Sequence, residues 1–165
     1  MATSKKESEN RLEIRRTFAA PREKVFAAWT ERARLEQWMC RDVTTHEPSY
    51  KELDVRPGGR YVIEIPVPKE GFTYRGHGEF REVKPPEKLV FTWGWEKVPV
   101  GKGKTEVLDG GESLVTVEFI ARGKSTEMIF THEGFPSAKV CEDHQKGWDG
   151  CFEVLDKYLA AQAKR

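Results

Sequence analysis

The chain has 165 residues, 33% of them charged, yet its formal net charge is only +1. Its length predicts one domain, over residues 10–165, and the near balance of charge argues against nucleic acid as a partner. No run of about 18 apolar residues is present, so no membrane span is expected. Three cysteines without a Cys-X-X-Cys spacing predict free thiols in a reducing cytoplasm, and the polar residues 1–9 predict a disordered tail.

The first predicted elements are a strand and two short helices. Apolar residues alternate along Asn10–Phe18, which predicts a strand. Pro21 is expected to open a helix, because its missing N–H is harmless in the first turn. Thr30 is expected to cap a second short helix over Glu31–Met39.

From Val43 the apolar residues recur at every second position, which predicts antiparallel strands joined by short turns. Each strand has one apolar and one charged face, so one side of the sheet should face water. The stretch Val98–Ser113 is rich in glycine and lysine and is expected to be a mobile loop. The predicted strands are Val43–Leu53, Arg60–Val67, Phe72–Val83, Lys88–Glu96, Leu114–Ala121 and Ser125–Glu133.

The last segment, Ser137–Leu159, has apolar residues at steps of three and four and predicts a long amphipathic helix with Ser137 as its N-cap. Gly147 and Gly150 flank Trp148, which suggests that another part of the chain packs very close to them. The order of elements predicts an α+β fold, in which a curved antiparallel sheet of about six or seven strands wraps around the C-terminal helix.

Three segments resemble a known family: Asp54–Ile65 (DVRPGGRYVIEI), Gly78–Glu96 (GEFREVKPPEKLVFTWGWE) and Phe130–Leu159 (FTHEGFPSAKVCEDHQKGWDGCFEVLDKYL). They are similar to the family named after the C-terminal domain of the activator of the Hsp chaperone ATPase, a branch of the START-like (SRPBCC) helix-grip superfamily. The resemblance covers nearly all the chain from Leu12 to Leu159. It implies a helix-grip fold with an interior cavity, and it brings no shared catalytic motif.

The candidate site is the space between the sheet and the last helix. Strand and helix periodicity places aromatic side chains on both walls of this space. Such side chains form either a filled core or the lining of a ligand pocket. Glycines on the inward face favour a pocket, and two histidines are either its polar end or structural. The candidate ligand-binding residues are Trp38, Tyr61, Gly76, Gly78, Trp93, Trp95, Phe130, His132, His144, Trp148 and Phe152.

Three functions remain open for such a chain. The first is binding of a hydrophobic, ring-containing small molecule, with no cofactor and no metal expected, because Cys141 and His144 alone do not make a zinc site. The second is a cavity enzyme, such as a cyclase or hydrolase, with His132 or His144 as general base. The third is an interaction protein such as a chaperone cofactor, which predicts a large apolar surface patch. The protein is expected to be a monomer or a homodimer.

Overall fold

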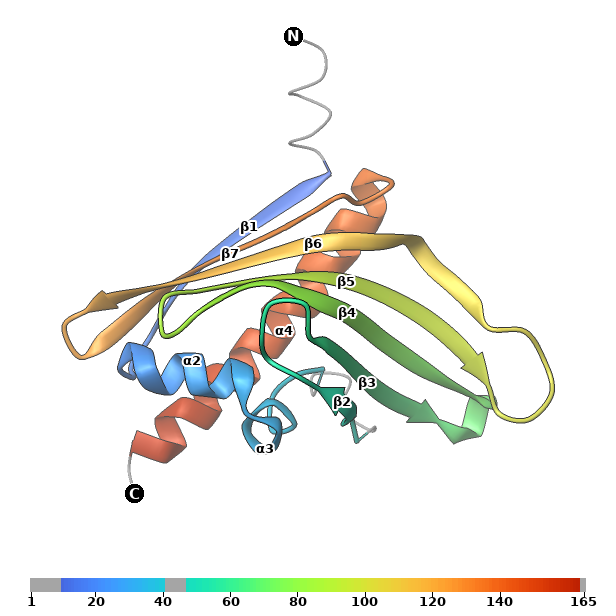
Figure 1. Ribbon diagram of the computed structural model, residues 1–165, viewed down its shortest axis with the longest axis horizontal. Coiled ribbons are helices and arrows are strands. Elements are labelled where there is room, and N and C mark those ends of the chain that lie inside the picture. The colour runs from blue at the N-terminus through green and yellow to red at the C-terminus, as the bar shows by residue number, and fades with distance from the viewer. Residues whose placement is uncertain (1–9, 41–46, 164–165) are drawn as a thin grey trace, which may run out of the picture.

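The computed structural model describes residues 10–40 and 47–163, and it shows a curved sheet with helices on its concave side (Figure 1). Two sequence predictions fall outside the described residues: the disordered tail over 1–9 and the beginning of the strand expected from Val43. The α+β class and the antiparallel sheet around a C-terminal helix are confirmed.

Within the described residues, seven antiparallel strands form one sheet in the order β1-β7-β6-β5-β4-β3-β2. From β2 to β7 each strand pairs with the next one along the chain, so this part is a meander, and β1 pairs with β7 at one edge. The strands are Arg11–Phe18 (β1), Ser49–Leu53 (β2), Arg60–Val67 (β3), Phe72–Lys84 (β4), Lys88–Pro99 (β5), Glu106–Arg122 (β6) and Ser125–Glu133 (β7).

The helices are α2 (Arg22–Thr30), α3 (Arg32–Leu35) and α4 (Ala138–Ala163), with a short 3₁₀ turn, η1, over Pro68–Glu70. No helix among the described residues is long and apolar enough to cross a membrane.

Two predicted helix caps have different outcomes. Ser137 caps α4 as predicted, because its Oγ accepts a hydrogen bond from the backbone N–H of Val140 at 3.2 Å. The predicted cap of α3 is wrong. Thr30 is the last residue of α2, and its hydroxyl donates to the Phe26 carbonyl at 2.9 Å, while Glu31 occupies the cap position.

The hairpin of β5 and β6 corrects the prediction of a mobile loop over Val98–Ser113. Strand β5 continues to Pro99 and β6 begins at Glu106, and Trp95 pairs with Leu108 across the two strands. The glycine and lysine content is typical of a loop, but most of these residues extend a hairpin beyond the body of the sheet (Figure 1).

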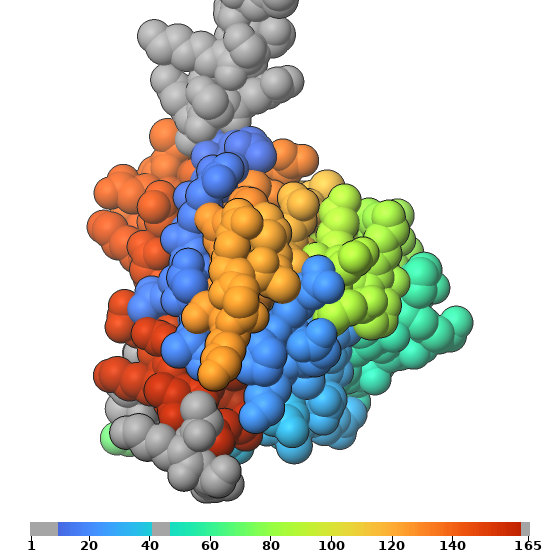
Figure 2. All heavy atoms as spheres, turned by 90° about the vertical axis from the view of Figure 1, so that its left-hand side faces the viewer, coloured from blue at the N-terminus to red at the C-terminus, as the bar shows by residue number. Residues whose placement is uncertain are grey.

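Helix α2 covers one end of the sheet, the end that faces the viewer in Figure 2, where β1, the β6–β7 turn and α2 lie side by side. Phe26 of α2 packs edge-on against Phe119 of β6, with ring centroids 5.6 Å apart. Thr126, at the start of β7, donates its hydroxyl to the Ala20 carbonyl at 2.7 Å. This end of the concave face is therefore filled by protein.

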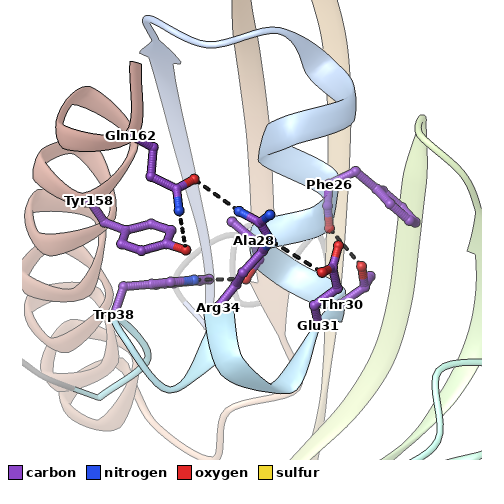
Figure 3. Close-up of polar contacts among 8 residues, drawn as sticks. All are labelled: Phe26, Ala28, Thr30, Glu31, Arg34, Trp38, Tyr158 and Gln162. Atoms are coloured by element: carbon purple, nitrogen blue, oxygen red, sulfur yellow. Dashed lines mark hydrogen bonds and ion pairs between the residues drawn. The ribbon is translucent and has the colours of Figure 1, made fainter. Parts of the chain in front are cut away.

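Polar contacts join α2 to the segment after α3, and join α3 to the C-terminal end of α4 (Figure 3). The buried Trp38 donates its indole N–H to the Ala28 carbonyl at 2.8 Å. Arg34 donates to Gln162 at 2.9 Å, and the amide of Gln162 donates to the hydroxyl of Tyr158 at 2.7 Å. These contacts fix one half of α4, and the pocket described next lies against the other half.

Candidate functional site

A pocket of about 400 Å³ lies between the sheet and the first half of α4. Its volume is typical of small-molecule sites. Strands β3 to β6, helix α4 and the end of the segment after α3 all contribute to its wall. The described lining residues are Cys40, Ile65, Tyr74, Trp93, Trp95, Leu108, Asp109, Asp143, His144, Gly147, Trp148 and Cys151.

The pocket has an apolar floor and a polar rim. Trp93 and Trp148 lie in the floor, are each 4% exposed, and pack with ring centroids 4.9 Å apart. Trp95 is partly exposed and stands edge-on to Trp93 at 5.4 Å. Asp109 and Asp143 are exposed and form part of the rim. The apolar part of a ligand is therefore expected to lie against the floor, with any polar group near the mouth of the pocket.

Trp93 carries a buried donor that the fold does not satisfy. Its indole Nε1 has no hydrogen-bond partner among the described residues, although the side chain lines the pocket. A buried unpaired N–H costs about 1–3 kcal/mol. Nε1 of Trp29, in the filled core, is unpaired in the same way, so this donor does not by itself mark a ligand site.

His132 connects the sheet to α4 through a chain of hydrogen bonds. Trp148 donates its indole N–H to His132 Nδ1 at 3.0 Å. His132 Nε2 lies 2.6 Å from Ser113 Oγ, and the Ser113 hydroxyl donates to the Trp93 carbonyl at 3.0 Å. Because Nδ1 accepts, we assign the proton of the neutral ring to Nε2, which donates to Ser113.

The environment of His132 keeps its imidazole neutral. Burial, with a smaller contribution from His144, lowers the pKa of His132 to about 2. Both ring nitrogens are occupied, and the residue is fully buried. His132 therefore orients Trp148 in the pocket floor and has no free nitrogen to act as a general base.

His144 presents one ring nitrogen to the pocket. Its Nδ1 donates to the Val140 carbonyl, one turn earlier in α4, at 2.9 Å. Its Nε2 lies 3.8 Å from Oδ2 of Asp109, which is an ion-pair distance when the imidazole is protonated and too long for a hydrogen bond. His144 and Asp109 thus form the polar side of the rim.

A wide bulge in β6 brings Asp109 to this rim. Trp93 pairs with Ser113 and Trp95 with Leu108, so β6 has three more residues than β5 has between these two pairs. Asp109, Gly110 and Gly111 all have positive φ, at 54°, 79° and 93°. Such a bulge bends the strand and redirects its side chains.

The strand glycines do not open the space that the sequence suggested. A Cβ at Gly78 would lie 1.9 Å from the Thr92 carbonyl oxygen and 2.7 Å from the ring of Tyr61, which donates its hydroxyl to that oxygen. A Cβ at Gly76 would lie 2.9 Å from Ile63. Neighbouring side chains and backbone already fill both positions.

Gly147 in α4, unlike the strand glycines, borders open space. Gly147 was expected to mark a close approach of another segment, but a Cβ there would meet no atom within 4 Å. Gly147 lines the pocket, so its missing side chain leaves part of the open volume.

The structure brings together four of the predicted ligand-binding residues, Trp93, Trp95, His144 and Trp148, in the pocket wall. The others lie in the sheet or the core and do not line it: Trp38, Tyr61, Gly76, Gly78, Phe130, His132 and Phe152.

Sequence reasoning missed several lining residues for identifiable reasons. Leu108 and Asp109 lay in the supposed loop, and Gly147 was assigned to a tight contact. Tyr74 shares its strand face with Gly76, and that parity was a signal that could have found it.

Two further observations concern sites elsewhere. Among residues 10–40 and 47–163, no group of three or more His, Cys, Asp or Glu side chains is placed to hold a metal ion. In the same ranges, the large apolar side chains that stand out as exposed are Val100 and Val107, both on the β5–β6 hairpin.

Known structures with the same fold come from several bacteria. Protein CV1439 from Chromobacterium violaceum is 22% identical with a TM-score of 0.74, over 91% of this chain and 96% of that one. A protein from Arthrobacter aurescens is 21% identical with a TM-score of 0.75, over 93% and 88%. One from Rhizobium leguminosarum is also 21% identical with a TM-score of 0.75, over 92% and 94%.

These identities are low, so they show the shared fold alone. No curated protein matches the chain. The family assignment instead rests on a sequence model of the Activator of Hsp90 ATPase homolog 1-like proteins, which matches residues 19–160. That range contains the three segments whose resemblance was noted from the sequence, together with the whole pocket lining. The chain therefore belongs to the Activator of Hsp90 ATPase homolog 1-like family.

Proposed function

We propose that this protein binds a small, apolar, ring-containing molecule in the pocket between the sheet and α4. The observation that carries the proposal is a pocket of about 400 Å³ whose buried floor is formed by the indole rings of Trp93 and Trp148. Aromatic walls favour an aromatic guest, because edge-to-face and offset ring contacts add about 0.5–1.5 kcal/mol to the burial of area.

The five tryptophans of the chain supply the test. In a ¹H–¹⁵N spectrum each indole N–H gives its own signal. Addition of 2-naphthol as probe is expected to shift the signals of Trp93, Trp95 and Trp148, which line the pocket. The signals of Trp29 and Trp38, which lie in the core, should shift much less. Equal shifts at all five, or none, would contradict a ligand in this pocket.

Two substitutions at Gly147 make the test specific. Gly147→Leu places a side chain into the open volume and is expected to abolish the probe-induced shifts. Gly147→Ala is the matched control, because it adds a single methyl group and should gain about 1 kcal/mol of helix propensity while binding persists. If Gly147→Leu binds the probe as the parent does, the ligand lies elsewhere.

A further inference from the structure

We infer that the ligand of this pocket carries a positively charged nitrogen beside its ring, an inference that rests on the proposed function. The described lining residues include two aspartates, Asp109 and Asp143, and no lysine or arginine. The described part of the lining thus combines aromatic walls with net negative charge. Aromatic faces and carboxylates together are the groups that recognise ammonium ions in water-exposed sites.

Asp109 is the carboxylate that the fold leaves for such a ligand. Asp143 is already paired with Lys139, with Nζ and Oδ1 2.9 Å apart. The ion-pair partner of Asp109 among the described residues is His144, whose Nε2 stands 3.8 Å away. Among residues 10–40 and 47–163, Asp109 therefore has no close cation to neutralise it, although it lies at the mouth of an apolar pocket.

The bulge in β6 holds Asp109 in this place. A Cβ on Gly110 would lie 2.8 Å from Pro136, so the bulge fits closely against the segment that leads into α4. The residue before Asp109, Leu108, pairs with Trp95. The carboxylate is thus carried by a close-packed segment next to the aromatic rim, where Tyr74 and Trp95 stand edge-on with ring centroids 6.3 Å apart.

This arrangement predicts the direction in which the ligand lies. Its ring occupies the buried floor against Trp93 and Trp148, and its charged nitrogen stays at the rim near Asp109. A charge at the rim keeps part of its water, so it does not incur the full cost of burial. The ligand class is therefore an aryl amine salt or aryl quaternary ammonium compound.

Two probes of the same shape separate charge from apolar binding. Phenyltrimethylammonium has a positively charged quaternary nitrogen where tert-butylbenzene has a neutral carbon. Titration followed by the indole signals of Trp93, Trp95 and Trp148 is expected to give about tenfold tighter binding of the cation. Gly147→Leu should abolish binding of both probes, because it fills the pocket.

Isosteric variants test whether the Asp109 carboxylate causes the preference for the cationic probe. Asp109→Asn keeps a residue that tolerates positive φ and removes the charge, so the ratio of the two affinities should fall to about one or two. Asp156→Asn, the same substitution at a residue of α4 that does not line the pocket, is the matched control and should leave the ratio unchanged. Equal affinities in the parent would overturn the inference about charge and leave the proposed function standing. Failure of both probes to reach the three pocket tryptophans would overturn both.

Discussion

Two histidines of this chain differ in role because of what their ring nitrogens contact. His132 has both nitrogens engaged, by Trp148 and by Ser113, and it is fully buried. His144 uses Nδ1 on the Val140 carbonyl and turns Nε2 toward Asp109 at the pocket rim. The sequence placed both inward correctly, but only the hydrogen bonds separate a structural imidazole from an available one.

The buried His132 makes a prediction about acid stability. Its pKa is about 2 in the folded protein, while an exposed histidine titrates near 6.5. Between these values the unfolded chain binds one more proton, so stability is lost as the pH falls below about 6.5. The free energy of unfolding in urea should fall by up to about 1.4 kcal/mol per pH unit from this group. In His132→Gln this contribution should be absent, and the decline between about pH 6.5 and 5 correspondingly shallower.

Ser113→Ala is the control for that experiment. It removes the hydroxyl beside His132 Nε2 and should lower stability at neutral pH by about 1 kcal/mol. The imidazole stays buried in this variant, so the steep pH dependence should remain. Parallel pH profiles for the parent and His132→Gln would show that His132 is not the group responsible.

Glycine shows the limit of prediction at the scale of single residues. A missing side chain was taken as a sign of empty space at Gly76 and Gly78 and as a sign of close packing at Gly147. The structure reverses both interpretations, because Ile63, Tyr61 and the Thr92 carbonyl occupy the space beside the strand glycines. Residues from other elements determine whether the space next to a glycine is filled, so the local sequence does not predict it.

At the scale of elements, periodicity predicted most strands and the long helix, because each has one face buried against the core. Strand β7 alternates buried and partly exposed residues along its length, and β3 does so from Arg60 to Val67. The distal part of the β5–β6 hairpin has no such buried face, so periodicity gave no strand signal there. The prediction rested on composition instead, which is typical of a loop. Its pairing is fixed by strand-to-strand hydrogen bonds, which leave no apolar pattern.

The bulge in β6 makes a prediction about stability at this scale. Gly110 and Gly111 both have positive φ, so alanine at either position costs about 1–2 kcal/mol. Only at Gly110 would the new Cβ also press on Pro136, at 2.8 Å, whereas at Gly111 the nearest atom is 3.9 Å away. Gly110→Ala should therefore destabilise the protein by about 1–3 kcal/mol more than Gly111→Ala in urea unfolding. Equal losses would mean that the bulge is not held by its contact with Pro136.

At the scale of the whole molecule, the pocket borders the core and shares Trp93 and Trp148 with it. On the core side, Trp29 of α2 has Phe130, Trp148 and Phe152 within 6.2 Å between ring centroids. The family motifs and element order predicted the curved sheet around the C-terminal helix. The position of the pocket could not be predicted, because it is the volume that remains once the aromatic side chains have packed.

Because the pocket shares its floor with the core, ligand binding should stabilise the folded protein. A probe that binds only the folded protein stabilises it by about 2.7 kcal/mol at a free concentration of 100 times its Kd. For a chain of this size that raises Tm by roughly 5–10 °C. With phenyltrimethylammonium, the parent and Asp156→Asn should show this shift when each is measured at 100 times its own Kd. Gly147→Leu should unfold near the parent temperature without any response, because a side chain at this position enters the open volume of the pocket and meets no packed atom there. A Gly147→Leu variant that keeps the full response would show that the probe stabilises the protein from a site outside this pocket.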